Sequence, residues 1–124
     1  MTYNISGGAI LSQATNITGN TAVDVYGPAP TSTVILAVVC TETGNVTPNL
    51  TIAKVNAAGT VTINYRFQKA MLAKETVVFD TPIVLKTGWK LRVTSSTATG
   101  LVDVDVSYLA PDKSSQGTRG GAQG

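Results

Sequence analysis

Residues 101–109 have the sequence LVDVDVSYL, and the alternation within this stretch indicates the fold more clearly than any other segment. The even-numbered residues from Val102 to Tyr108 are apolar, whereas the odd-numbered residues from Asp103 to Ser107 are polar. Successive side chains of a β-strand point to opposite faces, so this period of two predicts a strand with one buried and one exposed face. We therefore expect residues 101–109 to cover an apolar core with one face.

Similar short runs precede this stretch and are separated by turns rich in Gly, Pro and Asn. We expect strands at residues 21–26, 33–41, 50–55, 60–67, 75–79, 83–85 and 89–94. Thr, Val and Ile together account for 41 of the 124 residues, and β-branched side chains pack well on pleated sheets. About eight short strands of this kind predict an all-β fold, a single antiparallel, jelly-roll-like β-sandwich.

Two of these runs also predict which side chains enter the core. In the run 60–67, one face carries only apolar residues, which we expect to point inward: Val61, Ile63, Tyr65 and Phe67. In the run 89–94, Trp89 is in phase with Leu91 and Val93 and is expected in the core rather than on an exposed sugar-binding platform.

The run 33–41 is apolar on both faces, which is unusual for a strand with one side in water. Strict alternation places Ile35, Ala37 and Val39 on one face and the remaining apolar residues, including Cys40, on the other. Exposed apolar patches favour association, so both faces must be covered. The second face is expected to lie under either the N-terminal segment or another subunit. These alternatives give a set of candidate partner-interface residues: Tyr3, Ile5, Ile10, Leu11, Ile35 and Val39.

The expected domain organisation has three parts. Residues 1–20 form an N-terminal arm or an added edge strand, and residues 21–110 form the β-sandwich. Residues 111–124 are rich in Gly, Ser and Gln and contain no core-forming residue, so we expect a flexible C-terminal tail.

The composition argues against catalysis and against several kinds of partner. The chain has no histidine, which removes the commonest general base and most zinc sites. The best carboxylate pair, Asp103 and Asp105, should point into solvent, where no burial raises a carboxyl pKa for acid catalysis. We therefore predict no enzyme, no catalytic residues, no cofactor and no metal. The net charge of +2 is spread thinly and the longest apolar run is short, so neither nucleic acid nor membrane is an expected partner.

Charged residues make up only 13% of the chain, about half of the ~25% typical of soluble domains. A free monomer generally needs more surface charge than this to stay soluble. The low charge favours a protein whose surface is largely covered by neighbours.

Three segments in order give a resemblance to a known group. They are VDVYGPAP at 23–30, FDTPIVLKTGWKLRVT at 79–94 and LVDVDVSYL at 101–109. Residues 20–109 thereby resemble the small β-sandwich virion proteins of tailed bacteriophages, which include capsid decoration (cement) proteins and head-tail accessory proteins. Where those proteins commonly have a Pro-Ala-Gly-like turn, this chain has KAMLAKE at 69–75, and no functional residue carries over.

The resemblance implies a virion structural protein, assembled in the host cytoplasm. Its implied role is to bind the lattice of the major capsid protein, or other virion proteins, and to stabilise the shell as a homo-oligomer, with a trimer favoured. The alternative is a receptor- or glycan-binding module of a phage tail, neck or fibre.

Overall fold

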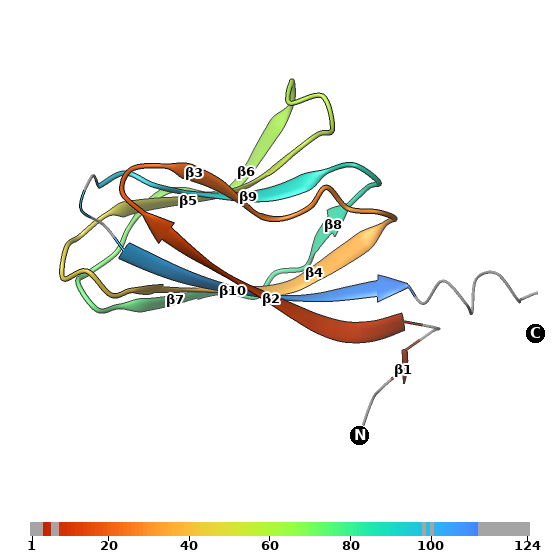
Figure 1. The fold of residues 1–124 in the computed structure, drawn as a ribbon, viewed down its shortest axis with the longest axis horizontal. Coiled ribbons are helices and arrows are strands. Elements are labelled where there is room, and N and C mark those ends of the chain that lie inside the picture. Colours follow the sequence, from red (N-terminus) through yellow and green to blue (C-terminus); the bar gives the residue numbers. More distant parts are fainter. Residues whose placement is uncertain (1–3, 6–7, 98, 100, 112–124) are drawn as a thin grey trace, which may run out of the picture.

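The computed structural model describes residues 4–5, 8–97, 99 and 101–111 of the 124-residue chain. All regular structure in the described residues is β-strand, and it forms two antiparallel sheets that pack face to face (Figure 1). The all-β sandwich predicted from the alternating runs is confirmed.

The large sheet contains six strands and the small sheet four. The large sheet has the order β1 (Asn4–Ile5), β2 (Gly8–Thr18), β10 (Leu101–Pro111), β4 (Thr33–Glu42) and β7 (Thr76–Phe79), and β8 (Ile83–Leu85) also pairs with β4. The small sheet has the order β3 (Ala22–Tyr26), β9 (Lys90–Ser95), β5 (Asn49–Val55) and β6 (Thr62–Ala70).

The chain passes repeatedly from one sheet to the other. Strands β2, β4 and β10 lie side by side in the large sheet, although β3, β5 and β9 of the small sheet intervene in sequence. Neighbouring strands are therefore distant in sequence, which is the arrangement of a jelly roll. The predicted jelly-roll-like topology is confirmed.

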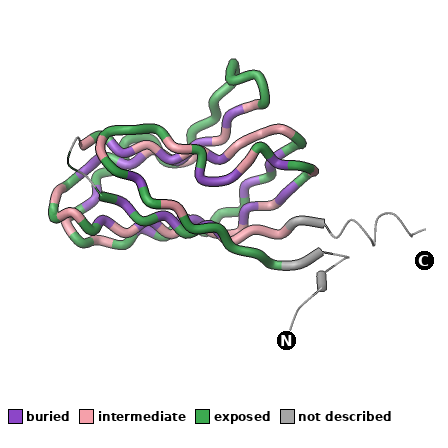
Figure 2. The backbone as a smooth tube through the Cα atoms, viewed as in Figure 1, coloured by how far each residue is buried: buried purple, intermediate pink, exposed green. Residues whose placement is uncertain are grey.

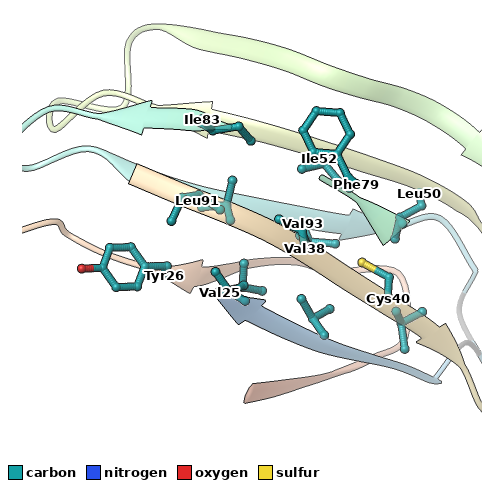
Figure 3. Packing of buried hydrophobic residues seen from close by; sticks show 14 of the residues in the cluster. Val25, Tyr26, Val38, Cys40, Leu50, Ile52, Phe79, Ile83, Leu91 and Val93 are labelled. Carbon is teal, nitrogen blue, oxygen red and sulfur yellow. The ribbon is translucent and has the colours of Figure 1, made fainter. Parts of the chain in front are cut away.

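The core lies between the two sheets and is mostly aliphatic, with Tyr26 and Phe79 as its buried aromatic residues (Figure 3). Val102, Val104 and Val106 of β10 are buried, whereas Asp103 and Asp105 are exposed, as the alternation at 101–109 predicted. The large sheet contributes this face of β10, and the small sheet covers it with buried residues of β3, β5 and β9. Burial of these side chains supplies the main favourable term in folding.

Cys40 lies in this core with its side chain fully buried. Burial raises the pKa of the Cys40 thiol to about 12, because the thiolate would lose its hydration. The thiolate is the reactive form, so we expect no reaction with an alkylating or disulfide reagent at pH 8 in the folded protein. One equivalent of thiol should appear on addition of denaturant. Rapid labelling of the native protein would contradict the buried placement.

In β4 the residues that face the core differ from those predicted, because the strand contains a bulge. Its pairing with β10 shifts between Ser107 and Tyr108, so that Ala37 pairs with Ser107 and Ile35 pairs with Tyr108. Leu36 is thus an extra residue, and a bulge of this kind changes which side chains point inward. The inward set is therefore Thr33, Ile35, Val38, Cys40 and Glu42, not the strictly alternating set expected from the sequence.

The strand β6 contradicts its prediction more strongly. Val61, Ile63 and Phe67 were expected in the core, but they are exposed, Phe67 to 67% and Ile63 to 42%. Only Tyr65 packs against the core. The reason is position: β6 is the last strand of the small sheet and projects away from both layers, so the opposite sheet does not cover it (Figures 1 and 2).

The described part of the N-terminal segment from residue 8 onward does not cover the second face of β4. Residues Gly8–Thr18 form the strand β2, which pairs with β10 in the same sheet along its whole length. Ile17 of β2 is buried in the core. Residues Gly8–Thr18 are thus a strand of the large sheet, and no described residue of this segment lies over the second face of β4.

Candidate functional site

The outer face of the large sheet carries an apolar row that crosses four strands. The pairing places Val84 of β8 beside Val34 of β4, Val34 beside Leu109 of β10, and Leu109 beside Ile10 of β2. Directly paired residues share a face, so all four side chains point to the same side. Val84 is 53% exposed and Ile10 48% exposed, while the two central residues are half-buried. We call these four residues the outer row.

A second row on the same face combines apolar and acidic groups. Val78 of β7 pairs with Val39 of β4, and Val39 pairs with Asp105 of β10. Asp103 lies on the same face, two residues further along β10, and accepts a hydrogen bond of 2.6 Å from Asn16 Nδ2. The outer face of the large sheet is thus an apolar surface that also carries the acidic residues Asp103 and Asp105 of β10.

A second exposed apolar surface lies on β6 and the segments that flank it. Its apolar members are Val61, Ile63 and Phe67, and its basic member is Lys69. Arg66 does not belong to it, because its guanidinium lies 4.9 Å from the centre of the Phe79 ring of the large sheet. We call Val61, Ile63, Phe67 and Lys69 the β6 ridge. Figure 1 shows β6 projecting from the small sheet on the side away from the large sheet, so the ridge and the outer row lie on different sides of the sandwich.

The charges on these two surfaces lack ion-pair partners within the described residues. The salt bridges found among these residues are Lys90–Asp24, at 3.9 Å, and Arg92–Asp24, at 2.8 Å. Neither Lys69 of the ridge nor Asp103 and Asp105 of the outer face take part in one.

The structure separates the candidate interface residues that the sequence suggested. Ile10 and Val39 lie on the outer face of the large sheet, in the two rows described above. Leu11 is exposed but pairs with Tyr108 on the inner side of β2, and Ile35 is buried in the core, so Ile35 is not a surface residue. Tyr3 and the side chain of Ile5 lie outside the described residues.

Other members of the two surfaces were missed by sequence reasoning. Val78 and Val84 each stand between two buried apolar residues in the short strands β7 and β8. Three consecutive apolar residues in a strand force the middle one to the opposite face. That pattern was a usable signal for Val78 and Val84, whereas nothing local distinguishes exposed Phe67 from a core residue.

Trp89 is partly buried and packs against the core, immediately before β9. The Lys54 ammonium lies 5.2 Å from the centre of its ring and donates a hydrogen bond of 3.0 Å to the carbonyl of Val84. The hydrogen bond joins β5 of the small sheet to β8 of the large sheet, while the cation–π contact is made to Trp89 beside β9.

Among the residues that the structure describes, no group of three or more His, Cys, Asp or Glu side chains is placed to hold a metal. No helix long and apolar enough to cross a membrane occurs in the described part of the chain.

Glu42, the last residue of β4, is fully buried. It accepts backbone hydrogen bonds from Gly44 (2.7 Å), Asn45 (3.0 Å) and Lys74 (3.0 Å). Desolvation alone would raise the pKa of Glu42, but the backbone N–H groups that it binds, including that of Val46, outweigh this and lower it. Asn45 and Lys74 both have positive φ, 61° and 65°, so this carboxylate fixes two turns with uncommon backbone conformations.

The comparisons with known proteins agree with the topology. No protein-family model and no curated protein matches this chain. A chain in the acidic stable capsid structure of Helicobacter pylori bacteriophage KHP30 is similar, with a TM-score of 0.58 and 11% identity over 82% of this chain and 88% of that chain. A pentameric capsid protein isolated from metagenomic phage sequences has a TM-score of 0.50 and 13% identity, over 78% of this chain and 59% of that chain.

At these identities the similarity shows the fold alone. The protein is a jelly-roll β-sandwich, and the same fold occurs in chains from the two phage capsid structures. A fold shared at this level hosts many functions, so the function has to be argued from the surfaces.

Proposed function

We propose that this protein is a structural component of a phage virion, and that it acts as a capsid decoration (cement) protein on the lattice of the major capsid protein. The observation that carries the proposal is the pair of exposed apolar surfaces, the outer row and the β6 ridge, on different sides of one small domain. Contiguous exposed apolar surface is typical of sites covered by another protein. A protein with neighbours on more than one side suits a repeating shell.

The stabilising mechanism is mass action. A protein that binds the assembled lattice, and not its dissociated subunits, lowers the free energy of the assembled state by its own binding free energy. The jelly-roll fold, which also occurs in the two phage capsid structures, supports this role. The low charged fraction of 13% supports it as well, because covered surfaces need few charges for solubility.

The proposal predicts the copy number of this chain in particles. Virions produced from the genome that encodes it should contain the chain in fixed proportion to the major capsid protein, with its density on the shell. Quantitative mass spectrometry and electron cryomicroscopy measure both quantities. A few copies confined to the tail, neck or a fibre would instead support the receptor- or glycan-binding alternative. Absence of the chain from the particles would contradict any virion role.

The terminal segments offer a second test of lattice binding. Deletion of residues 112–124, or of residues 1–7, leaves β2 and the core intact, whereas deletion of residues 1–20 would remove β2 with buried Ile17. If the ends bind the lattice, either short deletion should reduce occupancy on depleted particles in co-sedimentation, with an unchanged melting temperature. Unchanged occupancy of both deletion variants would show that the ends do not bind.

A further inference from the structure

We propose that copies of this protein associate head to tail, with the β6 ridge of one copy packed on the outer row of the next. The occupant of each surface is thus a second copy of the same chain. This inference concerns the protein in solution and does not depend on a role in capsid decoration.

Charge complementarity is the first argument for this pairing. The ridge carries Lys69, and the face that contains the outer row carries Asp103 and Asp105. Ion-pair partners for these three groups are missing from the described residues of their own copy. A ridge that packed on the ridge of a second copy would bring like charges together, and so would two outer faces. Contact between unlike surfaces brings opposite charges together.

Shape and hydrophobicity provide the second argument. The ridge projects from the sandwich, and Phe67 is its most exposed aromatic side chain, at 67%. The outer row lies on the face of a sheet and crosses four strands. A projecting aromatic residue that packs on an aliphatic surface is the usual centre of a protein interface, with charged groups at the rim.

The two surfaces lie on different parts of the protein, so the contact is heterologous. A heterologous contact leaves one ridge and one outer row free at the ends of any dimer. It therefore propagates, and produces a closed ring or an open chain according to the rotation between successive copies. An isologous dimer, in which a surface pairs with itself, stops at two copies.

Two blocking variants distinguish these arrangements. Phe67→Asp places a charge in the ridge, and Val84→Asp places the same charge in the outer row. Both side chains are more than half exposed, so neither substitution should disturb the core. Ala22→Asp, on an exposed position of β3, is the matched control. Circular dichroism and the melting temperature should be unchanged in all three variants.

Sedimentation equilibrium at high protein concentration measures the result. The wild-type protein and Ala22→Asp should have masses above the 12.8 kDa of one copy, and each blocking variant alone should be monomeric. An equimolar mixture of the two variants should form a heterodimer of twice the monomer mass. The Val84→Asp variant keeps an intact ridge, and this ridge can pack on the intact outer row of the Phe67→Asp variant. A monomeric wild type would overturn the inference, and so would a blocking variant that still associates alone.

The charge pairing has its own test. Raising the salt concentration from about 0.1 M to 1 M shortens the screening length from about 10 Å to about 3 Å, and should weaken wild-type association several-fold. Lys69→Glu and Asp105→Lys should each weaken association, and mixing the two variants should restore it. Association that is unchanged or strengthened by salt, with no restoration in the mixture, would overturn the assignment of opposite charges to this contact.

Discussion

Replacing Ile52 with alanine is expected to lower the free energy of unfolding by about 2–5 kcal/mol. Ile52 is fully buried in β5 and pairs with Val93 of β9, which is also fully buried. Removing its methyl and methylene groups loses their transfer free energy and leaves a cavity in close-packed surroundings. A domain of this size is stable by only about 5–15 kcal/mol, so the loss is a large part of the total. Urea denaturation followed by tryptophan fluorescence or circular dichroism measures the change.

The matched control for this variant lies on the neighbouring strand. Ile63 of β6 has the same side chain but is 42% exposed, and its replacement by alanine should cost less than about 1 kcal/mol. The alternation of residues 60–67 placed Ile63 in the core, so the sequence predicted a large loss for Ile63→Ala as well. Equal losses for Ile52→Ala and Ile63→Ala would show that β6 is covered, and would contradict its projection from the sandwich.

Replacing Glu42 with glutamine should give the second large loss of stability. The carboxylate of Glu42 accepts backbone hydrogen bonds from Gly44, Asn45 and Lys74, and an amide side chain offers only one acceptor oxygen in place of two. At pH 7 the melting temperature should fall several times further than in the control variant Asp80→Asn, because Asp80 is exposed. A thermal melt monitored by circular dichroism gives both values.

The loss from Glu42→Gln should also depend on pH. The pKa of Glu42 is lower in the folded protein than its ordinary value of 4.5, so the unfolded chain binds the proton more readily. The charge of Glu42 therefore stabilises the fold above pH 4.5, and this contribution is lost as the pH falls through the folded pKa. The difference in melting temperature between wild type and Glu42→Gln should accordingly narrow as the pH falls below 4.5. A constant difference from pH 7 to pH 3 would contradict this role.

The sequence predicted the strands because each depends on a local pattern. The alternation at 101–109 identified β10 and the correct buried face, since the period of two is a property of the strand itself. The runs at 83–85 and 89–94 were likewise found within one residue of β8 and β9. The run at 33–41 was identified as apolar on both faces, although the bulge at Leu36 changed which of its residues lie on each face.

By itself, then, the sequence determined the fold class and the approximate strands. It also showed that the chain has more apolar residues in its strands than one core can bury. The tertiary structure alone decided which apolar residues form the outer row and the β6 ridge. An apolar side chain is buried only where another layer lies opposite it, and that depends on strand order. Val61, Ile63 and Phe67 alternate as a core strand does, but β6 is the last strand of its sheet and projects beyond the opposing layer. The outer row likewise exists only because residues from four separate strands pair in register.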